Sequence, residues 1–378
     1  MPWGEKSTMS LRQEFIVFAL QEGSNIRGLS RRFGISAKTG YKWLNRYLLK
    51  GEPGLQDVSR RPHHSPTRTE SSLEQSVLSV RRRHPTWGGR KIRAFLLNQG
   101  VCPVPCASTI TEILRRHHRL EPKESGKRVH WKRFEHEAPN QLWQMDFKGH
   151  FAMVANRCHP LTILDDHSRF NVCLQACGNE RGSTVRNRLI SVFRLYGLPQ
   201  ALLMDNGPPW GADRGDAFTF LTVWLLRLGI RITHGRPYHP QTQGKEERFH
   251  RTLKADLLQN RVFRDLEHCQ AHFDRWRKIY NFERPHEALE MKTPGKKYHP
   301  SHRPFPETLP SVEYAPGEIV RKVQSKGEIY FKNKRFKVGK GFYGQPVALK
   351  PTLKEGVLDV YFMHQKITSV DINSESIT

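Results

Sequence analysis

A change of hydrophobic period at residue 140 is the feature that most constrains the fold of this chain. From residue 141 to 151 the side chains alternate, with Trp143, Met145, Phe147 and Phe151 on one side and Gln144, Asp146 and Lys148 on the other. A period of two predicts a strand. Further strands are expected at about 160–166, 170–176, 201–205 and 230–234, and helices at about 183–197, 215–228, 243–258 and 266–280. This order predicts an α/β core over residues 140–293.

Acidic residues lie at the strand ends of this predicted core. Asp146 belongs to the alternating strand, and Asp205 ends a short apolar run before a turn. A glutamate on the helix at 243–258 can converge with them. Carboxylates that are held together repel one another unless a cation lies between them. Hard oxygen ligands suit Mg²⁺ or Mn²⁺, so a metal site is predicted here.

The helix at 243–258 has two different faces. Glu247, Arg251 and Lys254 are spaced i, i+4 and i+7 and share one face, whereas Phe249 and Leu253 point away from it. A carboxylate beside two cations also fits an ordinary solvated, salt-bridged helix surface. On the spacing alone, that second interpretation stays open.

Residues 1–50 contain three helical segments, the last two joined by a glycine-containing turn. Asn25 and Ser36 are expected to cap the second and third helices. This pattern predicts a helix-turn-helix domain. Its third helix would offer four side chains to DNA, Lys38, Thr39, Lys42 and Arg46. A three-helix bundle with a charged surface is the alternative.

A second helical module is expected at residues 71–120, between two basic linkers at 51–70 and 121–139. Ser108 is expected to cap its third helix. The module is again predicted to be a helix-turn-helix. The side chains expected to contact DNA are Arg60 and Arg61 in the first linker and Arg90, Lys91, Arg115 and Arg116 in the module.

The last part of the chain changes character again. Residues 294–312 are proline-rich and predict a linker, and residues 313–378 hold short alternating segments separated by Gly and Lys turns. Such segments predict a small β-barrel. The chain is thus expected to be multidomain, with all-α modules, an α/β core and this barrel.

The charge balance indicates the kind of partner. Lys and Arg outnumber Asp and Glu by 62 to 36, a net charge of +26. This excess favours a polyanion, with nucleic acid ahead of an anionic membrane surface. No apolar run approaches the ~20 residues of a membrane span, and the first ten residues lack an apolar signal core. A cytoplasmic, nucleoid-associated protein is expected. The six cysteines lack zinc-ligand spacing, so we expect reduced thiols, mostly buried.

Five motifs in order give the chain a resemblance to a known family. They are WQMDF at 143–147, LDDHSR at 164–169, MDNG at 204–207, QGKEERFHRTLK at 243–254 and YNFERPHEAL at 280–289. The chain resembles bacterial insertion-sequence transposases of the retroviral-integrase superfamily. The stretch between the second Asp and the Glu is longer than is usual in that family, and we assign the extra residues to the polar loop at 210–216.

The resemblance implies an RNase H-like core with Asp146, Asp205 and Glu247 as catalytic metal ligands. Because the family's acid stands third after the glycine, Glu247 is selected over Glu246. Two Mg²⁺ ions about 3.5–4 Å apart would clamp the reacting phosphodiester, with Arg251 and Lys254 holding DNA phosphates. Asp165 and Asp166 are expected to be structural and to accept backbone N–H groups.

The function implied is that of a transposase. It would bind the ends of a mobile element, cleave the DNA and join the 3′-OH ends to target DNA, as at least a homodimer on double-stranded DNA. A non-enzymatic DNA-binding regulator on a decayed core is the alternative, and a plain nuclease is a second one. The resemblance makes the C-terminal domain an accessory DNA-binding or assembly domain; a structural cap is the alternative.

Overall fold

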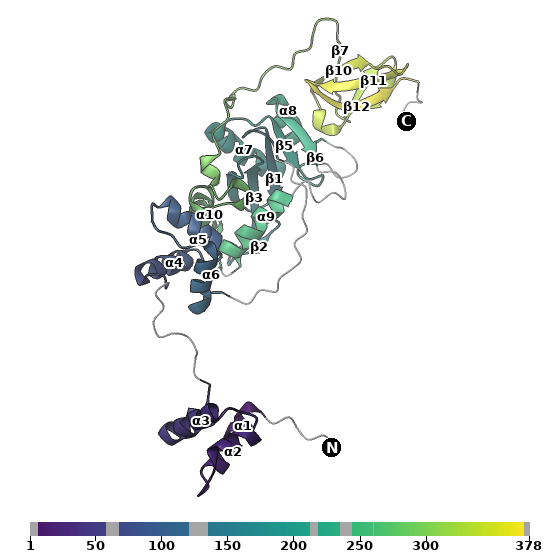
Figure 1. Ribbon diagram of the computed structural model, residues 1–378. Helices are drawn as coiled ribbons and strands as arrows, with labels where there is room; N and C mark the ends of the chain where they lie inside the picture. The colour runs from purple at the N-terminus through teal and green to yellow at the C-terminus, as the bar shows by residue number, and fades with distance from the viewer. Residues whose placement is uncertain are drawn as a thin grey trace. The chain divides into compact units, whose positions relative to one another are not determined.

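The chain divides into two compact units, Met1–Arg68 and Thr69–Thr378. The computed structural model, drawn in Figure 1, describes residues 7–57, 68–120, 135–211, 218–234, 244–259 and 261–373. The predicted DNA-contacting residues Arg60 and Arg61 lie outside these ranges, as does most of the predicted insertion at 210–216.

The first unit contains α1 (Thr8–Ala19), α2 (Ile26–Arg32) and α3 (Ala37–Lys50). Asn25 and Ser36 accept backbone hydrogen bonds from the first turns of α2 and α3, which confirms both predicted caps. A Cβ on Gly40 of α3 would lie 2.3 Å from Ser30 Oγ of α2. The two helices of the predicted helix-turn-helix therefore cross this closely because residue 40 has no side chain.

The second unit begins with another three-helix module, α4 (Ser71–Arg83), α5 (Gly89–Asn98) and α6 (Ala107–Arg116). Its apolar core is formed by Val77, Trp87, Ile92, Ile110 and Leu114, among others. The predicted cap of α6 at Ser108 is wrong: Cys106 is the N-cap residue, and Ser108 already lies in the first turn.

A mixed sheet forms the centre of the second unit. Its strands are β1 (Leu142–Phe147), β2 (Phe151–Ala152), β3 (Arg157–Asp165), β4 (Asn171–Cys177), β5 (Ala201–Met204) and β6 (Arg231–His234). β3 pairs antiparallel with β1, β2 and β4, whereas β1–β5 and β5–β6 are parallel pairs. The alternating stretch is thus confirmed as a strand, but it breaks into β1 and β2.

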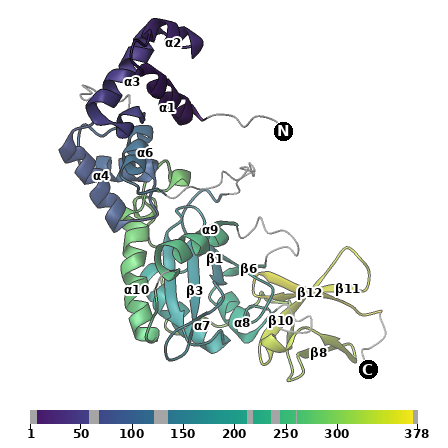
Figure 2. The same ribbon diagram turned by 90° about the horizontal axis from the view of Figure 1, so that it is seen from below.

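Helices cover both faces of this sheet (Figures 1 and 2). On one face, α7 (Gly182–Tyr196) and α8 (Phe220–Arg227) share an apolar core with Trp143 and Met145 of β1. On the other face, α9 (Gly244–Leu253) and α10 (Leu266–Lys278) pack on Leu164 and Leu174 through Phe249 and Phe273. A π-helical turn follows each of the last two helices, Lys254–Leu258 after α9 and Ile279–Glu283 after α10.

The second helical module is fixed to this core by polar contacts. Asp256, in the π-helical turn after α9, accepts hydrogen bonds from Thr86 between α4 and α5, from Trp276 Nε1 and from Arg284 Nη1. Arg90 forms an ion pair with Glu287 at 3.1 Å. Ile279 also packs against the apolar core of the module. A set of directional contacts therefore joins the module to the helices that cover the sheet.

The C-terminal region is not the closed barrel that the sequence predicts. The strands β7 (Ile319–Lys322), β10 (Pro346–Pro351), β11 (Val357–Phe362) and β12 (Gln365–Asp371) form an antiparallel sheet in the order β12-β11-β10-β7. A separate hairpin pairs β8 (Glu328–Phe331) with β9 (Lys334–Lys337). Over residues 313–373, no ladder joins β7 to β12, so the sheet stays open.

The α/β core packs against the open C-terminal sheet and buries its apolar side chains. The rings of Phe342 and Phe218 pack in a tilted arrangement, with their centroids 5.2 Å apart. The Gln365 side-chain amide hydrogen-bonds the backbone N–H and C=O of Ile232 on β6, at 3.3 and 3.4 Å. An apolar cluster runs continuously from α8 into the C-terminal strands. Apolar side chains that would fill a barrel are thus buried against the core instead.

Two further expectations concern the cysteines and membranes. All six cysteines are free thiols; four are buried, whereas Cys102 and Cys106 are exposed. Within the described ranges, no helix combines the length and the apolar character that a membrane span needs.

The buried Arg284–Asp256 pair yields a prediction about stability. The Nη1–Oδ2 distance is 2.9 Å, and the two side chains are 9% and 13% exposed. Asp256→Ala leaves the guanidinium buried without its carboxylate, so we expect a loss of about 3–5 kcal/mol in the free energy of unfolding of the second unit. Chemical denaturation of the full chain measures this loss. Glu307→Ala removes the exposed partner of Arg194 and is the matched control, with no measurable change expected.

Candidate active site

Asp146 and Asp205 lie side by side at the carboxyl ends of two central strands. In the parallel pairing of β1 with β5, Gln144 is opposite Leu203. Continuing this register by two residues brings Asp146 level with Asp205. Neighbouring strands in a sheet lie about 4.8 Å apart. Asp205 is exposed, and Asp146 is half-buried. The register alone therefore brings two predicted ligands together.

Among the described residues, the charges that act on Asp146 are those of other carboxylates. Burial, together with the negative charges of Asp205 and Glu180, raises the pKa of Asp146 to about 6, although a hydrogen bond with the Phe147 backbone opposes this rise. A carboxyl whose pKa is raised by another carboxylate marks a place where a cation would be stabilised. The oxygen donors present here therefore fit Mg²⁺ or Mn²⁺.

Helix α9 packs across β1 and turns Glu246 onto the sheet. The Thr162 hydroxyl lies 3.2 Å from Glu246 Oε2, 2.8 Å from His250 Nε2 and 3.0 Å from the carbonyl oxygen of Asp146. Glu246 is 1% exposed. Burial first, and then the charge of Asp146, raise the pKa of Glu246 well above its usual range.

Glu247 and Arg251 are exposed on α9, and Lys254, the first residue of the π-helical turn that follows, is exposed as well. The face predicted for these three residues is therefore present, as is the opposite face of Phe249 and Leu253, both buried. Glu247 is predicted to be the one glutamate of this helix that faces the aspartates. Glu246 is a second candidate, because it interacts with Asp146. The described parts of the chain contain no cluster of three Asp, Glu, His or Cys side chains that could hold a metal ion. Glu247 as third ligand stays a prediction.

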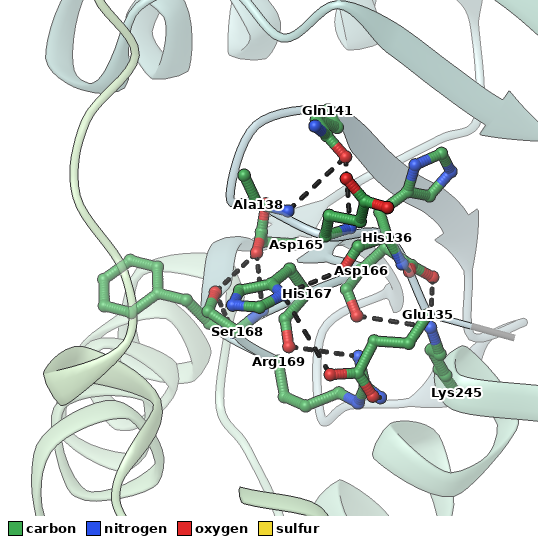
Figure 3. A network of polar contacts seen from close by, with 12 residues as sticks. Glu135, His136, Ala138, Gln141, Asp165, Asp166, His167, Ser168, Arg169 and Lys245 are labelled. Carbon is green, nitrogen blue, oxygen red and sulfur yellow. Dashed lines mark hydrogen bonds and ion pairs between the residues drawn. The ribbon is translucent and has the colours of Figure 1, made fainter. Parts of the chain in front are cut away.

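Asp165 and Asp166 are structural, as predicted (Figure 3). Asp165 accepts hydrogen bonds from the backbone N–H groups of Asn140 and Ser168, at 2.7 and 2.8 Å. Asp166 accepts one from the N–H of His136 at 2.9 Å. Both carboxylates are fully buried. Asp166 also pairs with Lys245, a contact for which the sequence gives no signal.

Four polar residues of this region were missed from the sequence, Gln144, Thr162, Lys245 and His250. Gln144 had one available signal, since the alternation put it on the same side as Asp146. His250 had another, because it is one helical turn after Glu246. Thr162 and Lys245 had none, since their contacts cross between β3, β1 and α9.

The predicted DNA-contacting residues of the first unit lie on α3. Lys38 and Lys42 are exposed, while Thr39 and Arg46 are half-buried. The backbone N–H of Thr39 donates to the capping hydroxyl of Ser36, and its own hydroxyl lies 2.9 Å from that oxygen. The Lys42 ammonium lies 4.3 Å from the Trp43 ring centroid. These side chains stay candidates for DNA contact.

The predicted contacts of the second module are partly engaged within the chain. Arg90 pairs with Glu287, Arg115 with Glu112, and Arg116 with Glu74. Burial, followed by the charge of Arg284, lowers the pKa of Lys91 to about 8. Arg90, Arg115 and Arg116 remain exposed, and their contact with DNA stays a prediction.

Comparison with family models covers all the parts described above. Two models described as "Integrase core domain" match residues 136–240 and 228–294. "Helix-turn-helix domain" matches residues 12–63, and "Homeodomain-like domain" matches 39–114. "IS481 family transposase, C-terminal domain" matches residues 318–378.

Two curated relatives are proteins of insertion elements. An uncharacterized 31.7 kDa protein of IS407 from Burkholderia multivorans is 29% identical over 42% of this chain and 55% of its own length. An uncharacterized 39.2 kDa protein of IS476 from Xanthomonas euvesicatoria is 28% identical over 42% of this chain and 44% of its own. The chain thus spans about half the length of these relatives. A Gag-Pro-Pol polyprotein of Simian retrovirus SRV-2 is 34% identical over 32% of this chain and 6% of its own length.

Two solved structures are also similar to the chain. A simian T-cell lymphotropic virus intasome, in complex with PP2A regulatory subunit B56 gamma, gives a TM-score of 0.39 at 16% identity, over 78% of this chain and 95% of that one. The trimeric form of the HTLV-2 integrase catalytic core domain with magnesium gives a TM-score of 0.33 at 16% identity. The match covers 43% of this chain and 99% of that one.

The strand order, the paired aspartates and the core models define an integrase-core protein with helix-turn-helix domains. Its C-terminal region is that of one transposase family in particular. The chain therefore combines an integrase core with a C-terminal region that matches the model of the IS481 transposase family.

The candidate metal site predicts stabilisation by Mg²⁺. A cation that binds the folded state adds about 1 kcal/mol to the free energy of unfolding when its concentration is about five times Kd. We expect Mg²⁺ to raise the melting temperature of the full chain, and Asp205→Asn to remove that increment because the amide keeps the shape but not the charge. Asp359→Asn, a carboxylate on β11, is the control and should keep it. An unchanged Mg²⁺ increment in Asp205→Asn would mean that Asp205 is not a ligand.

Proposed function

We propose that this transposase cleaves the ends of its mobile element and joins the exposed 3′-OH ends to target DNA. The observation that carries the proposal is the pairing of β1 with β5, which brings Asp146 level with Asp205 beneath helix α9. Two adjacent carboxylates, one of which raises the pKa of the other, suit divalent-metal chemistry better than a regulatory role. A decayed core would not need to retain these acids.

Asp146, Asp205 and Glu247 are the residues we assign to hold Mg²⁺ or Mn²⁺, two ions per site. Bound metal would stabilise charge on the scissile phosphate and activate the attacking water or 3′-OH. Mg²⁺ keeps several waters and binds substrate phosphate, so its ligands must be reachable from solvent. Asp205 and Glu247 are exposed, whereas Glu246 is 1% exposed. This difference favours Glu247 as the third ligand.

Two exposed basic residues, Arg251 of α9 and Lys254 at the start of the π-helical turn that follows it, are placed to hold the DNA. Arg251 lies about one helical turn beyond Glu247, and Lys254 about two. Both are exposed. A guanidinium and an ammonium beside the carboxylates would bind backbone phosphates and orient the scissile bond. We assign them to DNA contact during cleavage and joining.

Recognition of the element ends is assigned to the helical modules. Helix α3, with Lys38, Lys42 and Arg46, would enter the major groove. The second module adds exposed arginines and is fixed to the core through Asp256. Joining two element ends requires at least two copies of the chain on DNA. A plain nuclease would not need such docking modules.

The two neighbouring glutamates provide the sharpest test of the active site. Glu247→Gln should abolish Mg²⁺-dependent cleavage and joining, because a ligand charge is lost. Glu246→Gln should leave most activity, since the amide can keep the contact with Thr162. Joining of a pre-nicked end substrate to plasmid, measured for both variants, isolates the strand-transfer step.

The opposite pattern would contradict this assignment. Activity that survives in Glu247→Gln but is lost in Glu246→Gln would make Glu246 the third ligand, and would also remove Arg251 and Lys254 from the site. Binding of end DNA serves as the control for both variants, and it should stay at the wild-type level.

A second prediction concerns recognition by α3. Each phosphate neutralised by Lys or Arg contributes about −0.9 to the slope of log K against log salt concentration. Lys42→Met in the full chain should weaken binding of the terminal repeat and make this slope shallower by about 0.9. Lys292→Met, an exposed lysine paired with Glu290, should change neither. Gel-shift titrations at several salt concentrations measure both quantities, and an unchanged slope in Lys42→Met would remove Lys42 from the DNA contacts.

A further inference from the structure

The carboxylate of Asp166 is a buried junction between segments that are distant in the sequence. Its Oδ1 accepts hydrogen bonds from Gln144 Nε2 at 2.7 Å and from Lys245 Nζ at 2.5 Å, and its Oδ2 accepts one from the His136 N–H at 2.9 Å. Lys245 Nζ also donates to the Asp166 carbonyl oxygen at 3.2 Å. Figure 3 shows Lys245 reaching Asp166 from α9.

Two of these donors stand close in sequence to proposed metal ligands. Gln144 precedes Asp146 by two residues on β1 and lies on the same side of the strand. Lys245 precedes Glu247 by two residues in the first turn of α9. The Asp166 carboxylate therefore connects β1, which carries Asp146, with α9, which carries Glu247.

Apolar packing alone leaves the position of α9 underdetermined. Phe249 and Leu253 anchor the helix on the sheet, but apolar burial is not directional. An ion pair with hydrogen bonds has a fixed length and direction. Asp166 is fully buried, and the Lys245 side chain is 19% exposed, so water competes little with the pair. The contact therefore restrains both the rotation of α9 and its distance from β1.

An outer layer of polar contacts supports this junction. Arg169 Nη2 donates to Glu135 at 2.6 Å, and His167 Nδ1 lies 2.8 Å from the carbonyl oxygen of His136. Both contacts hold the 135–136 segment over the Asp166 carboxylate (Figure 3). This segment donates the His136 N–H to Asp166, so a third part of the chain is tied to the junction.

We propose that Asp166 and Lys245, with Gln144, form a positioning device that sets the separation of Asp146 and Glu247 required for metal binding. The proposal rests on the proposed function, since it concerns the same site. Neither Asp166 nor Lys245 touches the DNA or the metal in this scheme. Their role is to hold the first turn of α9 in the rotation that presents Glu247.

The test separates positioning from stability by using two variants of the full chain. Lys245→Met leaves Asp166 buried without its cation, so its melting temperature should fall. The double variant Asp166→Asn, Lys245→Met contains no buried unpaired charge, and most of the melting temperature should return. Lys366→Met, which removes a Lys–Asp pair of the C-terminal sheet, is the control and should match wild type in every activity measurement.

Activity and exchange measurements then decide between the two roles. For the double variant we expect single-turnover joining of a pre-nicked end, at saturating DNA, to stay at least tenfold slower than wild type. We also expect the Mg²⁺ concentration at half-maximal rate to rise at least fivefold. Amide hydrogen exchange in peptides that cover α9 should be faster, while end binding stays unchanged.

Recovery of both stability and wild-type joining in the double variant would overturn the proposal, because the pair would then only stabilise the fold. Unchanged amide exchange over α9 would overturn it as well. Absence of Mg²⁺-dependent joining in the wild type would refute the proposed function instead. The exchange and melting measurements would still decide whether the pair positions α9.

Discussion

The parallel pairing of β1 with β5 is the interaction on which the rest of this structure depends. It aligns the carboxyl ends of two buried strands, with Asp146 as the penultimate residue of β1 and Asp205 directly after β5. Antiparallel pairing of β3 with β1 then completes the central part of the sheet. The unfavourable proximity of Asp146 and Asp205 is tolerated because the surrounding apolar core over-determines the strand register.

Helix α9 adapts to this sheet by dividing its polar residues between two environments. Its inward polar residues, Glu246 and His250, meet Thr162 of β3, which is opposite Asp146 on the neighbouring strand. Its outward residues, Glu247 and Arg251, remain in contact with solvent. Such division allows one helix to close a polar network between itself and the sheet and to present charged groups to a large substrate at the same time.

The parts around the core are attached by different kinds of interaction. The second helical module is joined mainly through the Thr86–Asp256 hydrogen bond and the exposed Arg90–Glu287 pair, with one apolar contact at Ile279. The C-terminal sheet instead continues the apolar core of the second unit. Polar attachment is directional, so it specifies the orientation of the module. Apolar attachment explains why the C-terminal strands need no closed barrel, since the core supplies the burial that closure would have given.

The sequence by itself determined the elements of this protein and the types of their residues. Alternation from residue 141 predicted β1, cap residues Asn25 and Ser36 predicted two helix starts, and the five motifs predicted an insertion-sequence transposase with an integrase core. These signals are local, because they depend on periodicity and on the immediate neighbours of each residue. Only the tertiary structure decided which side chains meet. The Asp166–Lys245 pair, the burial of Glu246 beside Asp146 and the open C-terminal sheet all depend on contacts between residues far apart in the chain, and no local pattern of spacing encodes such contacts.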